Sequence, residues 1–161
     1  MHIRSATVKA LVITGFGLNC ERETATAFRQ AGALAEQVHL NEFLNGNRRL
    51  SEFHILAFIG GFSFGDHLGA ATVFANRIRC RLHDELTTFI RDGKLIIGIC
   101  NGFQTITRLG LVPRHGVSGY RPQTALTDNE HGVFRDAWVT VRANPESPCI
   151  FTKGVTLLRL P

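Results

Sequence analysis

The stretch Leu95-Ile96-Ile97-Gly98-Ile99-Cys100-Asn101-Gly102-Phe103-Gln104 decides the fold expected for this chain. An apolar run ends in a cysteine flanked by glycines, and residues 101–109 then show the pattern of a short helix that ends at Gly110. A strand that turns sharply into a helix is typical of the nucleophile elbow of α/β enzymes. We therefore expect Cys100 at an exposed tip, at the carboxyl end of a strand.

The preceding sequence alternates apolar runs with helical segments. Residues 8–14, 34–40 and 54–59 predict three more strands, and residues 41–49 predict a polar loop. The first strand leads to a helix that we expect Asn19 to cap and that ends near Gly32. Strands that are apolar on both faces and alternate with helices indicate a parallel sheet covered on each side. The predicted fold is α/β and doubly wound, with a mostly parallel, flavodoxin-like sheet.

A longer helix is expected before the cysteine strand. Large apolar side chains recur there every four positions, as one buried helical face requires, and Gly93 closes the pattern. They are Phe74, Ile78, Leu82, Leu86 and Ile90. Beyond Pro113 the pattern changes, and residues 124–127, 137–141 and 155–160 predict short strands.

Length and composition limit the class of protein. The 161 residues fit one domain, and 44% hydrophobic with 19% charged residues is typical of a packed globular fold. The net charge of +5 comes from scattered Lys and Arg, so no nucleic-acid or membrane patch is expected. No run approaches a membrane span of ~20 apolar residues, and residues 1–9 lack the apolar core of a secretory signal, which predicts a cytoplasmic protein.

The four cysteines form no Cys-x-x-Cys pair, which favours free thiols and no metal site. We expect Cys20, Cys80 and Cys149 to pack as structural residues. Cys100 is different, because a helix N-terminus directly behind it favours its thiolate, and the free N–H groups of the turn suit an oxyanion. The alternative for Cys100 is a small buried residue that ends a strand.

A glycine-rich loop, Gly60-Gly61-Phe62-Ser63-Phe64-Gly65-Asp66, follows the third predicted strand. Ligands of open α/β sheets bind at the carboxyl ends of the strands, so we expect this loop beside Cys100 with N–H groups that complete an oxyanion hole. No Lys-Ser/Thr follows the Gly60-to-Gly65 spacing, which disfavours an ATP-type phosphate loop. A plain turn is the alternative.

Three ordered motifs carry a resemblance to a known family. They are residues 14–20 (Thr-Gly-Phe-Gly-Leu-Asn-Cys), the glycine-rich loop 60–66, and residues 98–104 around Cys100. Together they closely resemble the glutaminase component of phosphoribosylformylglycinamidine synthase, a class I glutamine amidotransferase. The similarity extends from about residue 9 to residue 161, where Trp138 and residues 148–151 also match.

The resemblance implies a chemistry and a set of site residues. Cys100 would attack the side-chain amide of glutamine and release ammonia through a γ-glutamyl thioester. A synthase subunit or domain would use this ammonia together with ATP and Mg, and no cofactor is implied in this domain. Gly61 and Asn101 would supply the oxyanion-hole N–H groups. The implied glutamine-binding residues are Gly60, Phe62, Gln104, Asn129, Gly132 and Phe134.

The chain departs from this family at the catalytic base. Members carry a His-Pro-Glu segment near the C-terminus, whereas this sequence has no His-Pro dipeptide. Its one His-x-Glu, His83-Asp84-Glu85, precedes the cysteine and fits a solvated helix face. His115 and His131 follow Cys100, but loop histidines without a partner carboxylate are more typical of surface residues. We therefore expect the chain alone to be nearly inactive.

These observations leave three interpretations open. The preferred one is a single domain, 1–161, that lacks the C-terminal part of its fold and belongs to a longer glutaminase. Its exposed sheet edge would then favour a homodimer or poor solubility. The second is a non-catalytic module that docks on a synthase. The third is a cysteine hydrolase of the intracellular peptidase or chaperone kind, against which Gln104 and Asn129 argue.

Overall fold

The computed structural model describes residues 7–113 and 121–161 of the chain. The chain divides into two compact units, Met1–Leu126 and Thr127–Pro161, and each is described by itself. The organisation as one truncated domain over residues 1–161 stays a prediction.

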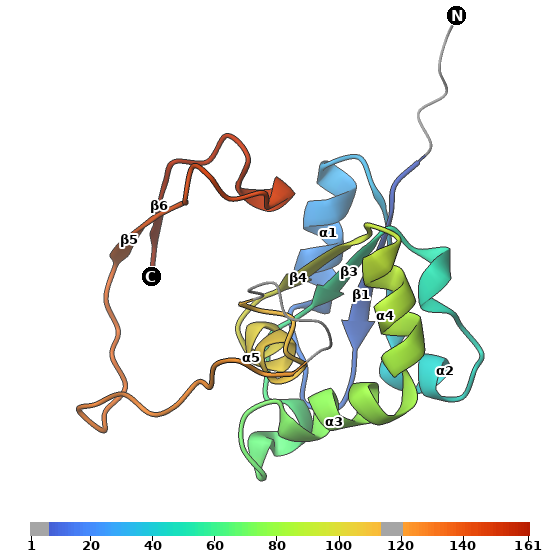
Figure 1. Cartoon of the computed structure of the whole chain (residues 1–161), viewed down its shortest axis with the longest axis horizontal. Coiled ribbons are helices and arrows are strands. Elements are labelled where there is room, and N and C mark those ends of the chain that lie inside the picture. The colour runs from blue at the N-terminus through green and yellow to red at the C-terminus, as the bar shows by residue number, and fades with distance from the viewer. Residues whose placement is uncertain (1–6, 114–120) are drawn as a thin grey trace, which may run out of the picture. The chain divides into compact units, whose positions relative to one another are not determined.

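The first unit is built around a parallel four-stranded sheet with strand order β2-β1-β3-β4 (Figure 1). Its elements are β1 (Lys9–Thr14), α1 (Glu21–Gln30), β2 (Leu34–His39), α2 (Leu40–Leu44), the 3-10 turn η1 (Leu50–Glu52), β3 (Ile55–Phe58), the 3-10 turn η2 (Ser63–Asp66), α3 (Thr72–Arg81), α4 (His83–Arg91), β4 (Leu95–Gly98) and α5 (Asn101–Arg108). This order confirms the expected α/β, doubly wound architecture.

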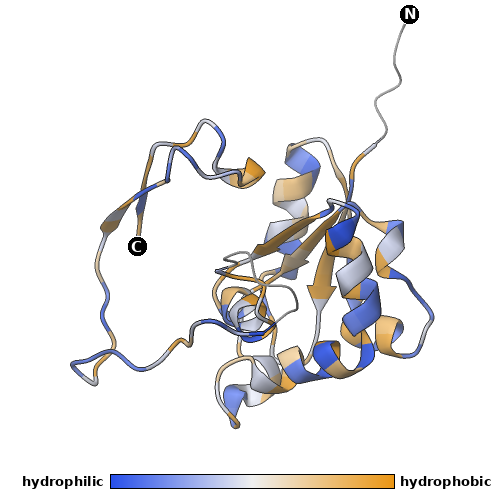
Figure 2. Ribbon diagram, in the orientation of Figure 1, coloured by the Kyte–Doolittle hydropathy of each residue, from blue (hydrophilic) through white to orange (hydrophobic). Residues whose placement is uncertain are grey.

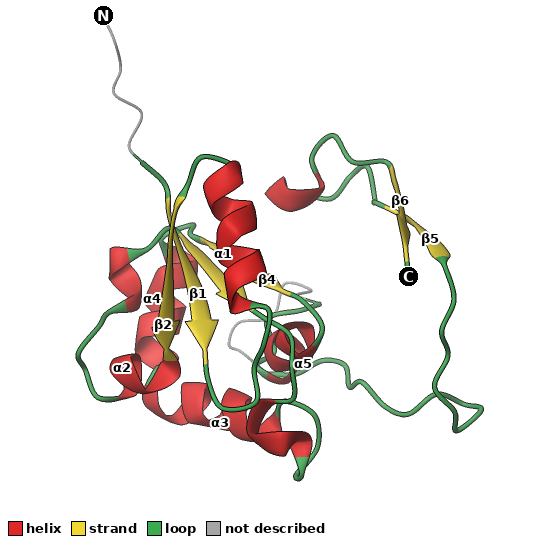
Figure 3. Cartoon of the chain, turned by 180° about the vertical axis from the view of Figure 1, so that it is seen from behind, coloured by secondary structure: helices red, strands yellow, loops and turns green. Residues whose placement is uncertain are grey.

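Both faces of the sheet are covered, as the apolar strands predict. In β1, Leu11 and Ile13 join a core cluster that includes residues of α3, α4 and α5, whereas Ala10 and Val12 join a second cluster with Ala25 of α1. Figure 2 shows β1, β3 and β4 as mostly apolar ribbons between amphipathic helices. Viewed from behind, α1 lies against β1 and β2 (Figure 3).

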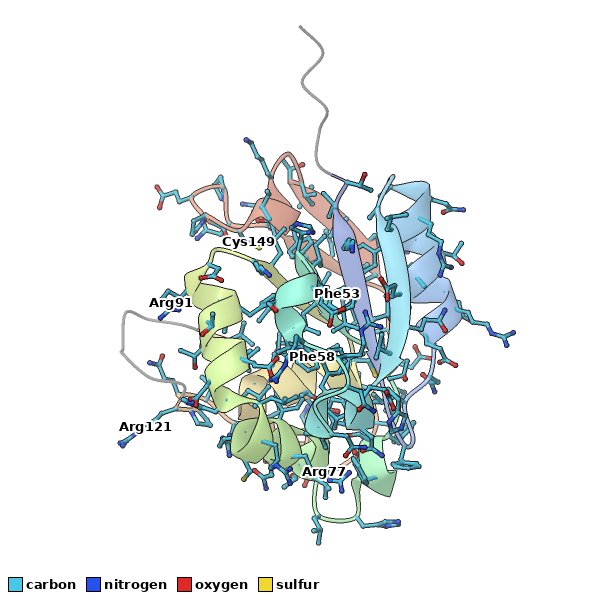
Figure 4. All side chains as sticks on the ribbon, turned by 90° about the vertical axis from the view of Figure 1, so that its right-hand side faces the viewer. Phe53, Phe58, Arg77, Arg91, Arg121 and Cys149 are labelled. Atoms are coloured by element: carbon cyan, nitrogen blue, oxygen red, sulfur yellow. The ribbon has the colours of Figure 1, made fainter. Side chains whose placement is uncertain are left out.

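Aromatic side chains fill the larger cluster. Phe53 and Phe58 are fully buried within the unit, while Arg77 and Arg91 extend from its surface (Figure 4). Burial of each large apolar side chain stabilises the fold by roughly 1.5–3 kcal/mol. This core therefore provides a rigid base for the loops at the carboxyl ends of the strands.

The structure corrects the single long helix expected between Phe74 and Ile90. Two helices, α3 and α4, meet at Leu82, whose φ of −125° and ψ of 13° are not helical. Leu82 is nonetheless buried, so the four-residue burial period continues through the break and conceals it in the sequence. In α4, Phe89 is the buried residue of the last turn, and Ile90 only packs against the core from its edge.

The polar loop expected at residues 41–49 is also wrong in its first part. Residues Leu40–Leu44 form α2, because Leu40 and Phe43 are buried in the core. The side chain of His39 caps this helix by accepting a hydrogen bond from the backbone N–H of Asn41 at 3.1 Å.

The second unit contains an antiparallel pair, β5 (Val139–Arg142) and β6 (Leu157–Leu160), with the 3-10 turn η3 (Ile150–Thr152) between them. Two of the three strands expected beyond Pro113 are thus confirmed. Residues 124–127 are not a strand: their composition suits one, but they join no ladder in the described part of the chain.

Two further features of the fold concern membrane-spanning helices and the edge of the sheet. No helix within residues 7–113 and 121–161 is long and apolar enough to cross a membrane. In the first unit, β4 is the half-buried edge strand of the four-stranded sheet. The homodimer across an exposed edge and the cytoplasmic location stay predictions.

Candidate active site

Cys100 occupies a strained turn between β4 and α5. Its φ of 55° and ψ of −117° lie in a region that non-glycine residues rarely adopt, at a cost of about 1–3 kcal/mol. The residue is exposed, which excludes the alternative of a small buried cysteine at a strand end. An exposed thiol on a strained strand-to-helix turn is the geometry of a nucleophile elbow.

The two flanking glycines allow the backbone to close this turn. A Cβ on Gly98 would lie 2.7 Å from the carbonyl oxygen of Gly102, and a Cβ on Gly102 would lie 2.0 Å from the carbonyl oxygen of Phe58. Neither distance is possible for real side-chain carbons. The turn therefore leaves no room for a Cβ atom at either position.

The glycine-rich loop after β3 lies beside Cys100, although 40 residues separate them in sequence. The ideal Cβ position of Gly60 is 3.5 Å from Cys100 Cβ and 3.9 Å from Cys100 Sγ. The neighbourhood expected from the carboxyl ends of adjacent parallel strands is thus present.

A short backbone ladder fixes Gly61 against the loop that follows β1. Gly61 pairs with Leu18 in an antiparallel bridge, in which Asn19 N donates to Gly60 O at 2.9 Å and Phe62 N donates to Gly17 O at 2.8 Å. Gly61 has a φ of 122°, and a Cβ there would lie 2.3 Å from Gly17 O. The ladder uses the N–H groups of Asn19 and Phe62 and leaves that of Gly61 outside it.

Asn19 takes part in this ladder and does not cap α1, which corrects the sequence expectation. The N-cap is Cys20, in the left-handed conformation with a φ of 65°. The side-chain oxygen of Asn19 accepts from the Cys20 thiol at 3.4 Å. Because its backbone N–H is hydrogen-bonded to Gly60 O, the side chain of Asn19 lies at the same edge of the sheet as Cys100.

Asn101 is the first residue of α5, and the first four N–H groups of an α-helix have no partner within it. The N–H of Asn101 therefore lies at the start of α5, directly after Cys100, and the N–H of Gly61 lies in the glycine-rich loop beside Cys100. The arrangement is compatible with the oxyanion hole implied by the sequence, whose two donors stay predictions.

The side chain of Asn101 joins the elbow to the glycine-rich loop, a feature that sequence reasoning missed. It is buried, its Oδ1 accepts from Ser63 N at 3.2 Å, and its Nδ2 donates to the two oxygens of Asp66 at 3.2 and 3.1 Å. The same Nδ2 donates to Gln104 Oε1 at 3.0 Å. The available signal was Asp66, which ends the quoted loop motif.

Exposed apolar side chains surround the loops of this sheet edge. Phe62, an expected substrate-binding residue, is 68% exposed, and Gln104 is half-buried one helical turn after Cys100. The other exposed apolar residues of these loops and of α5 are Phe16, Leu68, Ile99 and Phe103.

Three expected glutamine-binding residues lie in the second unit. Asn129 and Gly132 form a turn, in which Gly132 N donates to Asn129 O at 2.8 Å and Asn129 Nδ2 donates to Val133 O at 2.9 Å. Phe134 follows with 90% of its surface exposed. His131 lies in the same turn, His115 lies outside the described residues, and the roles of all of these stay predictions.

The His-x-Glu segment has a structural role at the start of α4. Glu85 accepts from Arg49 Nη1 at 2.8 Å and from Leu50 N at 3.0 Å, which ties α4 to η1. His83 and Asp84 are exposed and lie 3.2 Å apart at Nδ1 and Oδ1. The solvated helix face expected from the sequence is thus confirmed for His83 and Asp84, whereas Glu85 is half-buried against η1.

The cysteines are free thiols, as expected, but the packing expected for three of them is wrong. Cys20, Cys80 and Cys149 are all exposed. In the case of Cys20 the cause is its N-cap position, where the left-handed backbone holds the side chain at the loop surface.

Proteins with assigned names are similar in sequence to this chain. Two relatives are named phosphoribosylformylglycinamidine synthase subunit PurQ. The protein from Methanococcus maripaludis is 44% identical to this chain, and the protein from Dehalococcoides mccartyi is 45% identical to it. They align with 95% and 96% of this chain, which spans 56% and 60% of their respective lengths. The chain thus spans little more than half the length of these curated relatives.

A solved structure and a family pattern agree with these relatives. The structure of PurLQS from Thermotoga maritima contains a chain that superposes with a TM-score of 0.74 at 29% identity, over 97% of this chain and 66% of that one. The sequence pattern described as the CobB/CobQ-like glutamine amidotransferase domain matches residues 7–161. The chain therefore belongs to the CobB/CobQ-like glutamine amidotransferase domain family.

Proposed function

We propose that the chain carries the nucleophile of a glutaminase that supplies ammonia to phosphoribosylformylglycinamidine synthase in purine biosynthesis. The observation that carries this proposal is the exposed Cys100 on its strained elbow, with Gly60 and Gly61 beside it. The names of the PurQ relatives support the same reaction.

The proposed reaction begins with attack of the Cys100 thiolate on the side-chain amide carbon of glutamine. The carbonyl oxygen becomes an oxyanion, to which the N–H groups of Gly61 and Asn101 donate. When the intermediate collapses, the C–N bond breaks and the nitrogen takes a proton to leave as ammonia. Water then hydrolyses the γ-glutamyl thioester, releases glutamate and regenerates the thiol.

Proton transfer in this reaction needs a base, and the sequence has no His-Pro-Glu segment. Two histidines of the first unit are engaged in local hydrogen bonds: His54 Nδ1 accepts from Lys9 N at 3.0 Å, and His39 Nδ1 accepts from Asn41 N at 3.1 Å. General acid–base help is worth roughly 10²–10⁴-fold in rate. We therefore expect the 161-residue chain alone to be nearly inactive.

Covalent labelling tests the nucleophile. A diazo-ketone analogue of glutamine should add its mass to Cys100 in the full-length native protein that contains this chain, and glutamine should be converted to glutamate. The exposed Cys20, Cys80 and Cys149 are internal controls, because they should react with iodoacetamide but not with the analogue. Cys100→Ala should abolish both labelling and turnover. A full-length protein that hydrolyses no glutamine, even with its synthase present, would refute the proposal.

A non-catalytic module that docks on the synthase is the second candidate. In either case we expect the partner to be the synthase subunit or domain, which would bind ATP and Mg. The 161-residue chain of a docking module should co-purify with the synthase and leave its ammonia-dependent activity intact. Failure to bind would count against the module.

A further inference from the structure

Asp66 lies at the centre of the hydrogen bonds that join the glycine-rich loop to the nucleophile helix. Its Oδ1 accepts from Ala71 N at 3.0 Å, and both of its oxygens accept from Asn101 Nδ2. An ionised carboxylate can only accept hydrogen bonds. Asp66 therefore requires Asn101 to turn its NH2 group toward the loop.

The opposite side of the Asn101 amide is fixed as well. Its Oδ1 accepts from the backbone N–H of Ser63, which can only donate. A reversed Asn101 would place NH2 against N–H and carbonyl oxygen against carboxylate. Since Asn101 is 1% exposed, water cannot compensate for either mismatch, and each unsatisfied buried group would cost about 1–3 kcal/mol.

This fixed amide in turn orients Gln104. The second hydrogen of Asn101 Nδ2 is directed at Gln104 Oε1, 3.0 Å away, so the oxygen of Gln104 faces inward. Gln104 is half-buried and lies one turn along α5, where its backbone N–H donates to Cys100 O at 3.1 Å. The NH2 group of Gln104 is then the end of its amide that remains for a ligand.

We propose that Asp66 is a positioning residue that acts through Asn101 to make Gln104 a hydrogen-bond donor toward the ligand at Cys100. The group of the ligand that meets Gln104 must then be an acceptor, such as a carboxylate or carbonyl oxygen of an amino acid. This inference rests on the proposed function for the identity of that ligand, glutamine. The hydrogen bonds of Asp66 in the described structure go to Ala71 N and Asn101 Nδ2.

An exchange of the side chains of Asp66 and Asn101 distinguishes a role in orienting Gln104 from a role in holding the loop alone. In the double variant Asp66→Asn and Asn101→Asp, residue 66 donates to residue 101, and the hydrogen bonds from Ala71 N and Ser63 N are kept. The new carboxylate at 101 requires Gln104 to reverse its amide and present oxygen to the ligand. The loop is therefore held as before, while the polarity toward the ligand is inverted.

The experiment measures glutamine binding by titration calorimetry and the melting temperature in the full-length protein with its synthase. All binding variants carry Cys100→Ala so that no turnover occurs. We expect Asp66→Asn to weaken binding about tenfold and to lower the melting temperature. The exchanged pair should recover the melting temperature but not the affinity. In a Gln104→Ala background, the exchange should have no further effect on affinity.

The matched control is Asp92→Asn, which removes the same charge from an exposed position at the end of α4. It should leave glutamine affinity unchanged. Full recovery of affinity in the exchanged pair, or unchanged affinity in Asp66→Asn, would overturn the relay. If the Cys100 protein neither binds nor hydrolyses glutamine, the proposed function fails. The hydrogen bonds between Asp66 and Asn101 are then tested by the melting temperatures alone. If the losses of Asp66→Asn and Asn101→Asp simply add in the double variant, the two side chains are not coupled and the relay is overturned.

Discussion

Gly60 and Cys100 come from different strands, yet a methyl group on Gly60 would contact the thiol directly, 3.5 Å from Cys100 Cβ and 3.9 Å from Sγ. Its third neighbour within 4 Å would be Asn19 Oδ1 at 3.6 Å. All three distances are ordinary van der Waals contacts, so an added carbon fits without moving the backbone. The glycine therefore leaves open the space in which a substrate would approach the sulfur.

The first prediction uses this space. Gly60→Ala should keep the fold, because the new contacts are not clashes and its φ is not in the left-handed region. It should slow labelling of Cys100 by the glutamine analogue about tenfold or more, since a small displacement of reacting atoms is costly. Labelling rates by mass spectrometry, together with the melting temperature, measure both effects. Gly46→Ala is the control for the labelling rate, because a Cβ there meets no atom within 4 Å, and its left-handed φ of 77° should lower only the melting temperature. An unchanged labelling rate would contradict the assignment of this space to substrate.

The second prediction concerns the packing of the elbow. Gly102→Ala should destabilise the protein by about 3 kcal/mol, because its Cβ would lie 2.0 Å from a backbone oxygen of β3 that cannot move freely. Gly46→Ala should cost only the left-handed penalty of about 1–2 kcal/mol, since Gly46 has a φ of 77° and open space. Urea unfolding of the two variants compares these costs. Equal losses would show that the elbow relaxes around the methyl group.

Local patterns predicted the sheet and the elbow, whereas side-chain hydrogen bonds between segments distant in sequence could not be predicted. Gly98, Cys100 and Gly102 lie within five residues, so their spacing alone indicates a tight turn. The contact between Asp66 and Asn101 spans 35 residues and depends on which strands are neighbours, which no local pattern records. Leu82 lies at the break between α3 and α4 and is buried. The apolar periodicity therefore continues through the break and does not indicate it.

The glycine-rich motifs predicted the tight turns from their spacing, and they also carried the resemblance to a family. Gly60 was expected beside Cys100 because both follow the carboxyl ends of strands, where open α/β sheets bind their ligands, and the pairing of β3 with β4 brings them together. Asn19 looked like a helix cap because Asn is common there, but its backbone is used by the ladder to Gly60, and this tertiary contact overrides the local preference.

The third prediction is a pH dependence at the Arg48 cluster. Arg48 Nη2 lies 2.9 Å from both Glu36 Oε2 and Glu52 Oε2. The hydrogen bond from Arg48, followed by that from the backbone N–H of Arg49, holds the pKa of Glu52 below its ordinary value of 4.5. A carboxylate whose pKa is lowered by folding stabilises the protein above its unfolded pKa and loses this effect as the pH falls through its folded pKa.

Glu52→Gln should therefore be less stable than the unsubstituted protein at neutral pH, and the difference should shrink as the pH falls below 4.5. The effect is small because both side chains are partly exposed and solvent screens the pair. Urea midpoints across the pH range measure it. In an Arg48→Gln background the difference at neutral pH should be smaller. A difference that stays constant to about pH 3 would contradict the assigned cause.

The last prediction tests the strain stored at Cys100. A glycine substitution normally destabilises a protein relative to alanine, because glycine loses more backbone freedom on folding. At Cys100 the order should reverse, since φ of 55° and ψ of −117° are accessible to glycine but strained for alanine. We expect Cys100→Gly to be more stable than Cys100→Ala by about 1 kcal/mol in urea unfolding. Both variants lack the thiol, so the comparison isolates the backbone. If alanine proves equal or better, Cys100 is not strained, and the elbow geometry on which the nucleophile assignment rests is wrong.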